Sequence, residues 1–107
     1  MKEPAVLKSL AALAQAHRLR VFRALVVAGP AGSTPTTLAK RIKVSPATLS
    51  FHLKELLTAG LITQQRSGRH LIYRADFGRM NDLLAYLTEN CCVGERCAEP
   101  VLPTCSR

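Results

Sequence analysis

The chain has 107 residues, 48% of them hydrophobic, so it can bury one core but is too short for two independently folding domains. Its formal net charge is +8, from 15 basic and 7 acidic side chains, which favours a polyanionic partner such as nucleic acid. The charge is uneven, because residues 1–75 carry 12 basic and 2 acidic side chains, whereas residues 76–107 carry 3 and 5. The body of the protein is therefore expected to attract phosphate, and the end of the chain is not.

The sequence also disfavours a membrane or secreted location. No stretch approaches the roughly 20 apolar residues that span a bilayer, and the first residues lack the apolar run and small-residue cleavage site of a signal peptide. We therefore expect a cytoplasmic protein with no membrane partner. All 4 cysteines lie in the last 17 residues, which in a reducing compartment favours metal or redox chemistry over a disulfide scaffold.

Apolar residues recur at helical spacing near the start of the chain. They form two runs: Val6, Leu7, Leu10 and Leu13, then Leu19, Val21, Phe22, Leu25 and Val26. The runs predict two helices that are separated near His17, the second of which ends at Gly29-Pro30.

The next two segments begin with the same signal for a helix N-terminus. In each, a hydroxyl residue suited to the N-cap precedes a proline suited to the first helical position, as in Thr34-Pro35 and Ser45-Pro46. We expect a short helix over residues 35–42 and a longer one over residues 46–59, ended by Gly60 in the left-handed conformation. Two helices joined by so short a turn form a helix-turn-helix.

The remaining elements are a hairpin and a last helix. Strand-like runs at residues 61–66 and 70–74 flank the tight turn Ser67-Gly68, and a helix from about Phe77 to Asn90 follows. Its apolar side chains lie along one side, at Met80, Leu83, Leu84 and Leu87. The predicted fold class is α+β and mainly helical, a winged helix-turn-helix with a two-stranded hairpin as its wing. Residues 1–90 would form the folded domain, and residues 91–107 a cysteine-containing tail.

The helix over residues 46–59 has one face for the core and one for a partner. Leucines within about 100° of one another are assigned to the core: Leu49, Leu53, Leu56 and Leu57. The first turns of the second helix enter the major groove in this motif, which makes the opposite face the candidate DNA contact: Ser45, Ala47, Thr48, Ser50 and Phe51. Contact with a thymine methyl group would explain Phe51, as would packing against a neighbouring element. His52, on the flank, is either a phosphate contact or a surface histidine.

Cations at the hairpin suggest a second contact with DNA. Arg66 and Arg69 bracket the turn, where they suit a phosphate backbone or a narrow minor groove. Exposed arginines are also common on hairpins that have no such role. Lys40, Arg41 and Lys43 are assigned to diffuse attraction of the polyanion.

Three stretches of this chain resemble the ArsR/SmtB family of metal-responsive repressors. They are Leu10 to Leu25, then Leu38-Ala-Lys with Ser45-Pro-Ala-Thr-Leu-Ser-Phe-His-Leu-Lys-Glu-Leu, then Ala59-Gly-Leu-Ile to Tyr73. The most specific part is Leu49-Ser-Phe-His-Leu-Lys followed by Ala59-Gly-Leu-Ile. The resemblance implies a repressor of transcription that binds double-stranded operator DNA as a homodimer joined through its first and last helices.

The resemblance also implies a role for the cysteines. Many arsenic-sensing members carry Cys-Val-Cys at the start of the first helix of the helix-turn-helix, where this chain has Thr34-Pro-Thr-Thr-Leu and no cysteine. Leu87-Thr-Glu-Asn-Cys-Cys-Val-Gly-Glu-Arg-Cys is instead similar to an arsenite-responsive subgroup with a vicinal cysteine pair and a third cysteine after the last helix. This implies Cys91, Cys92 and Cys97 as ligands of an inducer, As(III) or Sb(III), with no obligatory cofactor.

The chemistry of three close thiolates agrees with such an inducer, because arsenite is three-coordinate and soft thiolates bind soft centres. Binding would unwind the end of the last helix and change the spacing of the two recognition helices in the dimer. Three alternatives stay open: a four-sulfur zinc or cadmium site that includes Cys105, a thiol redox sensor that links Cys97 to Cys91 or Cys92, and a tail without function. An enzyme is disfavoured, since the cysteines follow a helix C-terminus, where the dipole opposes thiolate formation.

Overall fold

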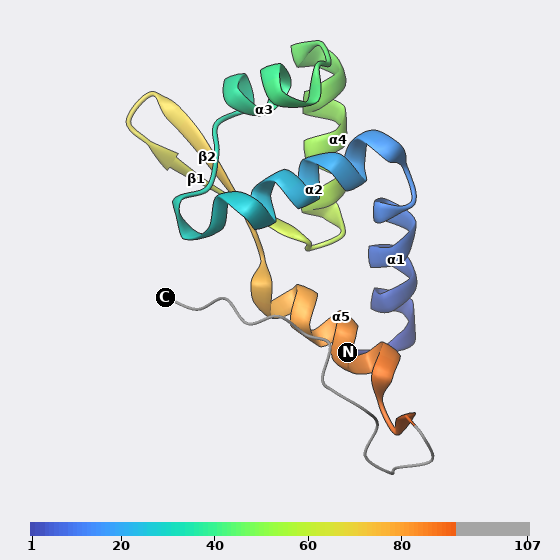
Figure 1. Cartoon of the computed structure of the whole chain (residues 1–107). Coiled ribbons are helices and arrows are strands. Elements are labelled where there is room, and N and C mark those ends of the chain that lie inside the picture. Colours follow the sequence, from blue (N-terminus) through green and yellow to red (C-terminus); the bar gives the residue numbers. More distant parts are fainter. Residues whose placement is uncertain (92–107) are drawn as a thin grey trace.

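A computed structural model describes residues 1–91 of the chain, and within them one hairpin lies between a series of helices and a last helix (Figure 1). In chain order the elements are α1 (Glu3–Leu13), α2 (Ala16–Ala28), a short 3-10 helix η1 (Gly29–Ala31), α3 (Pro35–Ile42), α4 (Pro46–Thr58), β1 (Ile62–Ser67), β2 (His70–Ala75) and α5 (Phe77–Thr88). The strands pair antiparallel. The predicted winged helix-turn-helix is confirmed.

The helix-turn-helix begins and ends where its capping residues predict. The Thr34 hydroxyl accepts a hydrogen bond from the backbone N–H of Thr37 (3.3 Å), which starts α3 at the predicted residue. Lys43 then adopts a left-handed backbone conformation, with φ of 66°, and turns the chain from α3 into α4. Gly60 takes φ of 79° after α4, as expected for a terminator.

The junction between α1 and α2 lies earlier in the chain than predicted. The Gln15 side chain caps α2, because its Oε1 accepts a hydrogen bond from the backbone N–H of Arg18 (2.9 Å). Arg18 Nε in turn donates to the Ala12 carbonyl (2.7 Å) and ties the start of α2 to the end of α1. The break predicted near His17 therefore falls at Ala14-Gln15, and His17 itself lies inside α2.

The base of the wing is anchored to the segment that precedes α3. Ser33 and Tyr73 exchange two backbone hydrogen bonds, of 2.9 and 2.8 Å, and Arg74 Nε donates to the Pro30 carbonyl (2.7 Å). Gly32 makes this approach possible, since a Cβ there would lie 2.5 Å from the Tyr73 carbonyl oxygen. The hairpin is thus held at its base, and its tip is free to reach a partner.

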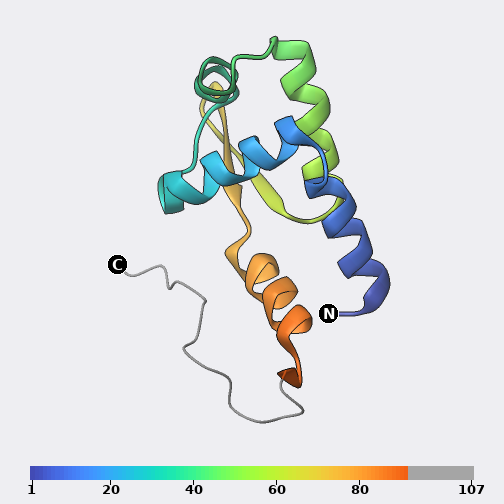
Figure 2. The same cartoon turned by 45° about the vertical axis from the view of Figure 1, so that its right-hand side comes forward.

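The core is shared by α2, α3, α4 and the start of the hairpin. Its most deeply buried apolar side chains are Val21, Leu25, Leu38, Leu49, Leu56 and Leu61. In both views α3 and the start of α4 lie at one end of the molecule, and α5 lies at the other with the N-terminal part of α1 (Figures 1 and 2). No helix within residues 1–91 is long and apolar enough to cross a membrane.

Candidate nucleic-acid interface

The side of α4 that faces away from the core is exposed over two turns. Ala47, Ser50, Phe51 and Lys54 follow the spacing of one helical face, and all four are exposed. The opposite side is buried as predicted, with Leu49, Leu53 and Leu56 at most 3% exposed, and Leu57 is half-buried at its edge. The helix therefore presents small and aromatic side chains on a surface that the protomer leaves open.

Phe51 is the largest apolar side chain on this surface. It is 55% exposed, and its ring meets the ring of His52 edge-on with centroids 5.5 Å apart. More than half of the ring is thus available to a partner.

The hydroxyl groups of Ser45 and Thr48 are linked in the cap of α4. Ser45 Oγ accepts from the backbone N–H of Thr48 (3.1 Å) and donates to Thr48 Oγ1 (2.9 Å). The hydroxyl of Ser45 thus caps α4, and the hydroxyl of Thr48 lies beside it in the first turn of the helix.

The structure corrects the expectation for His52. Its side chain is only 6% exposed, and Nδ1 is buried with no hydrogen-bond partner within residues 1–91. It lies beside His17 of α2, with ring centroids 5.6 Å apart. Neither a phosphate contact nor a surface histidine describes this position, because the ring belongs to the packing between α2 and α4.

The surroundings of His52 disfavour the charged form of its imidazole. Burial is the main cause that lowers the pKa of His52 below its ordinary value of 6.5, and Arg18 and His17 lower it further, against a smaller opposing effect of Glu55. A charged imidazole here would be poorly solvated beside a guanidinium group. The α2–α4 contact is therefore best satisfied with His52 unprotonated.

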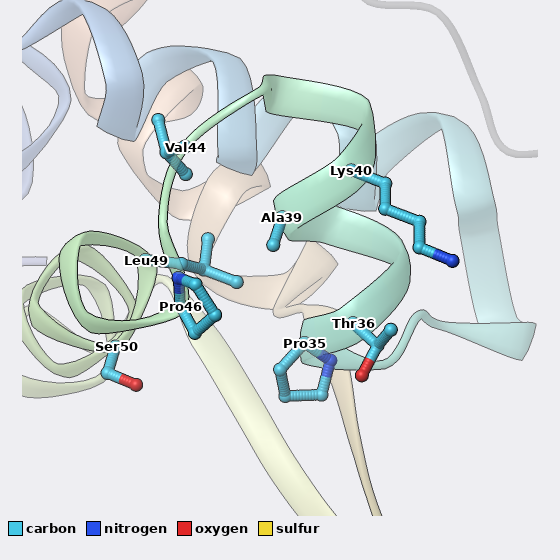
Figure 3. A pocket seen from close by; sticks show the side chains of 8 residues that line it. All are labelled: Pro35, Thr36, Ala39, Lys40, Val44, Pro46, Leu49 and Ser50. Atoms are coloured by element: carbon cyan, nitrogen blue, oxygen red, sulfur yellow. The ribbon is translucent and has the colours of Figure 1, made fainter.

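A groove of about 350 Å³ runs between α3 and α4 (Figure 3). Figure 3 shows an apolar interior flanked by two hydroxyl groups, with Lys40 extending to the outer side of α3. The lining residues are Pro35, Thr36, Ala39, Lys40, Val44, Pro46, Leu49 and Ser50. Sequence reasoning missed this groove, because it depends on the angle between two helices.

The wing carries two cations near its turn, one of which lies beside α3. Arg66 and Arg69 are exposed near the turn, where Gly68 adopts φ of 63° with open space around it. Arg69 and His70 also line a notch of about 470 Å³ with Thr36 and Thr37 in the first turn of α3. The structure thus brings Arg69 close to the start of α3, where backbone N–H groups and hydroxyls favour an anion.

The predicted inducer site begins where the described part of the chain ends. α5 stops at Thr88, Asn90 takes a left-handed φ of 58°, and Cys91 is exposed directly beyond them. Cys92, Cys97 and Cys105 lie outside the described residues. Within residues 1–91, no three His, Cys, Asp or Glu side chains are arranged to hold a metal ion.

Comparison with known proteins agrees with this geometry. A family model described as a helix-turn-helix domain matches residues 13–65. A solved structure described as a possible transcriptional regulator for arsenical resistance is 30% identical, with 75% of this chain and 80% of that chain covered and a TM-score of 0.65. An ArsR-like transcriptional regulator from Rhodococcus sp. RHA1 is 27% identical over 85% of this chain and 82% of its own, with a TM-score of 0.72.

The chain belongs to the ArsR family of transcriptional regulators. It is accordingly a regulator with a DNA-binding fold and not an enzyme. A structure described as the homodimeric winged helix-turn-helix DNA-binding domain of Mb0332 from Mycobacterium bovis, a possible ArsR-family transcriptional regulator, matches 90% of this chain and 89% of its own at 21% identity, with a TM-score of 0.64. The comparison with curated proteins finds no match.

Proposed function

We propose that this ArsR-family regulator is a homodimeric repressor of an arsenic-resistance operon, and that As(III) or Sb(III) releases it from operator DNA. The observation that carries the DNA-binding part is the exposed face of α4. Its small side chains allow a close approach to base edges, and Phe51 offers an apolar contact to a thymine methyl group.

Different residues of the interface have different tasks in this proposal. Ala47, Thr48, Ser50 and Phe51 contact base edges and set the sequence preference. Arg66 and Arg69 contact the backbone and set the position of the protein on the duplex. The groove between α3 and α4 lies where the first helix of a helix-turn-helix crosses the backbone, and the hydroxyl groups of Thr36 and Ser50 at its edge can donate to a phosphate.

Exposed leucines on α1 and α5 support the homodimer. Leu7 is 59% and Leu10 39% exposed on α1, and Leu87 is 54% exposed on α5, whereas Leu83 is buried within the protomer. Exposed leucines on two neighbouring helices are typical of an interface between copies. The homodimeric description of the Mycobacterium bovis relative agrees with such an assembly.

The position of Cys91 supports the sensing part. It follows α5 directly, and α5 contacts α1, so both proposed dimer helices are within reach of a change at this cysteine. In this proposal residues 1–90 form the DNA-binding and dimerisation domain, and residues 91–107 form the sensor tail. Ligation of As(III) by Cys91, Cys92 and Cys97 shifts α5 and the spacing of the recognition helices. Such couplings are worth about 1–3 kcal/mol, or about 5- to 150-fold in operator affinity.

Single cysteine variants test the sensor. Cys91→Ser, Cys92→Ser and Cys97→Ser should each abolish or greatly weaken release from a fluorescent operator by arsenite, while operator binding without arsenite persists. Serine keeps the shape but supplies a hard, protonated oxygen, so a lost response reports ligation. Cys105→Ser is the matched control and should respond as the parent does.

Three results of this test would contradict the three-thiolate site. Equal damage from Cys105→Ser would indicate a tetrahedral zinc-type site. Release by peroxide that a reductant reverses, without any metalloid, would indicate a redox sensor. A full response of Cys97→Ser would leave a two-thiol site.

A further inference from the structure

A cluster of three arginines lies between α2 and α3. Arg20 and Arg23 come from α2 and Arg41 from the last turn of α3, and together they surround a depression of about 300 Å³. Its floor is apolar, formed by Ala24, Val27 and Ile42. Sequence reasoning assigned Arg41 to diffuse attraction and did not connect it with α2. We refer to these six residues as the arginine cluster.

No negative charge within the described chain compensates this cluster. All three arginines are exposed, no carboxylate lines the depression, and within residues 1–91 none of the three guanidinium groups has an ion-pair or hydrogen-bond partner. Arg20 and Arg23 are three residues apart on one helix, where like charges destabilise the fold slightly. A set of convergent, unpaired guanidinium groups is suited to carboxylates or phosphates, which accept their paired N–H donors.

The apolar floor of the cluster distinguishes between these anions. Val27 is 69% exposed, the most exposed of the large apolar side chains in residues 1–91. A phosphodiester backbone offers little to cover it, whereas a protein segment can place an aliphatic or aromatic side chain on it between carboxylates. Arginines around an apolar centre are also typical of protein–protein contacts.

The arginine cluster faces away from the recognition helix. Val21, Phe22 and Leu25 form the side of α2 that is buried in the core with the leucines of α4. At about 100° per residue, Arg20, Arg23 and Val27 point about 180° from that side. The cluster is also built from neither α1 nor α5, the helices of the proposed dimer. It is thus accessible in a dimer whose α4 helices are inserted in DNA.

We propose that the arginine cluster is a docking surface for an acidic segment of another protein, which it binds while the repressor is on its operator. Carboxylates of the segment pair with Arg20, Arg23 and Arg41, and an apolar side chain between them covers Val27 and Ile42. Only docking to the operator-bound repressor rests on the proposed function; the docking surface itself does not.

A labelled peptide tests this docking surface directly. The probe is a short fluorescein-labelled synthetic peptide in which single leucines are flanked by glutamates, titrated with the full-length protein alone and with the protein saturated by operator DNA. We expect equal affinity in the two titrations. Arg23→Gln and Val27→Ser should each weaken peptide binding about fivefold or more, since each removes a central contact. Lys8→Gln is the matched control, because it removes one exposed positive charge on α1, and it should change the affinity less than twofold.

Every other result counts against the docking surface. Absence of peptide binding, an equal loss in Lys8→Gln, or displacement of the peptide by operator DNA would each overturn it. So would an unlabelled non-operator duplex that displaces the peptide from the operator complex, because nucleic acid would then be the partner of the cluster. Operator affinity is measured in the same samples without peptide, so a failure of DNA binding is seen separately from a failure of docking.

Discussion

Replacing Phe51 with alanine separates DNA reading from folding within one helix. An aromatic side chain has about 200 Å² of surface to bury. With 55% of Phe51 exposed, about 110 Å² remains for a partner to cover, worth at most about 2–3 kcal/mol at about 25 cal/mol per Å². We therefore expect Phe51→Ala to weaken operator binding by up to about 30- to 150-fold and to lower the free energy of unfolding by less than the loss of a fully buried side chain does.

Leu53→Ala is the matched control two residues along the helix. Leu53 is 3% exposed, so this change should lower the free energy of unfolding by about 2–5 kcal/mol. Its folded fraction should bind the operator normally. The assay is fluorescence anisotropy of an operator duplex beside urea unfolding followed by circular dichroism. The assignment of α4 faces is wrong if Phe51→Ala destabilises the fold as Leu53→Ala does, or if it binds the operator unchanged.

Three further predictions concern charge, assembly and pH. Operator affinity should fall steeply as the salt concentration rises. Arg69→Ala should make the slope of log affinity against log salt concentration shallower by about 0.9, and it should weaken binding to all DNA sequences alike. A slope that does not change would mean that Arg69 contacts no phosphate. Leu10→Lys places a charge in the proposed interface and should yield monomers by sedimentation, and an intact dimer would show that α1 faces elsewhere. Because the fold lowers the pKa of His52, its contribution to stability should be complete above pH 6.5 and decline as the pH falls through the folded pKa. His52→Gln should flatten that decline in urea unfolding, and an unchanged pH profile would contradict the proposed cause.

The local elements of this fold follow from short-range chemistry. The start of α3 at Pro35 and of α4 at Pro46 follows from a hydroxyl side chain that caps the helix and a proline that is preorganised for its first turn. Such signals act within three or four residues and can be read without tertiary structure. The start of α2 at Ala16 carries no such signal, because its cap is the amide of Gln15 and its anchor is a side chain-to-carbonyl bond from Arg18.

His52 shows how residue type can mislead where periodicity does not. Leu49, His52, Leu53 and Leu56 have the spacing of a buried helical face, and all four are buried. Assigning the core by hydrophobicity alone removed the histidine from that face and put Leu57, which is half-buried, in its place. The spacing alone would have located the ring between α2 and α4.

Features that join distant segments could not be predicted from the sequence. The bridge between Ser33 and Tyr73, the groove between α3 and α4, and the convergence of Arg41 with Arg20 and Arg23 all depend on how elements pack. In each case the residues carry no local signal for their partner. The candidate base contacts on α4 needed only one helix and could be predicted, whereas the surfaces that two elements share could not.

The most direct test of the proposed function is a titration of the preformed operator complex with different inducers. Fluorescence anisotropy would follow release by arsenite, antimonite, methylarsenite, zinc and cadmium in a reducing buffer. We predict release by As(III) and Sb(III) at concentrations well below those at which zinc or cadmium has any effect, because three thiolates suit a three-coordinate soft centre. Release by zinc at low concentration without release by arsenite would contradict the account and favour a tetrahedral metal sensor.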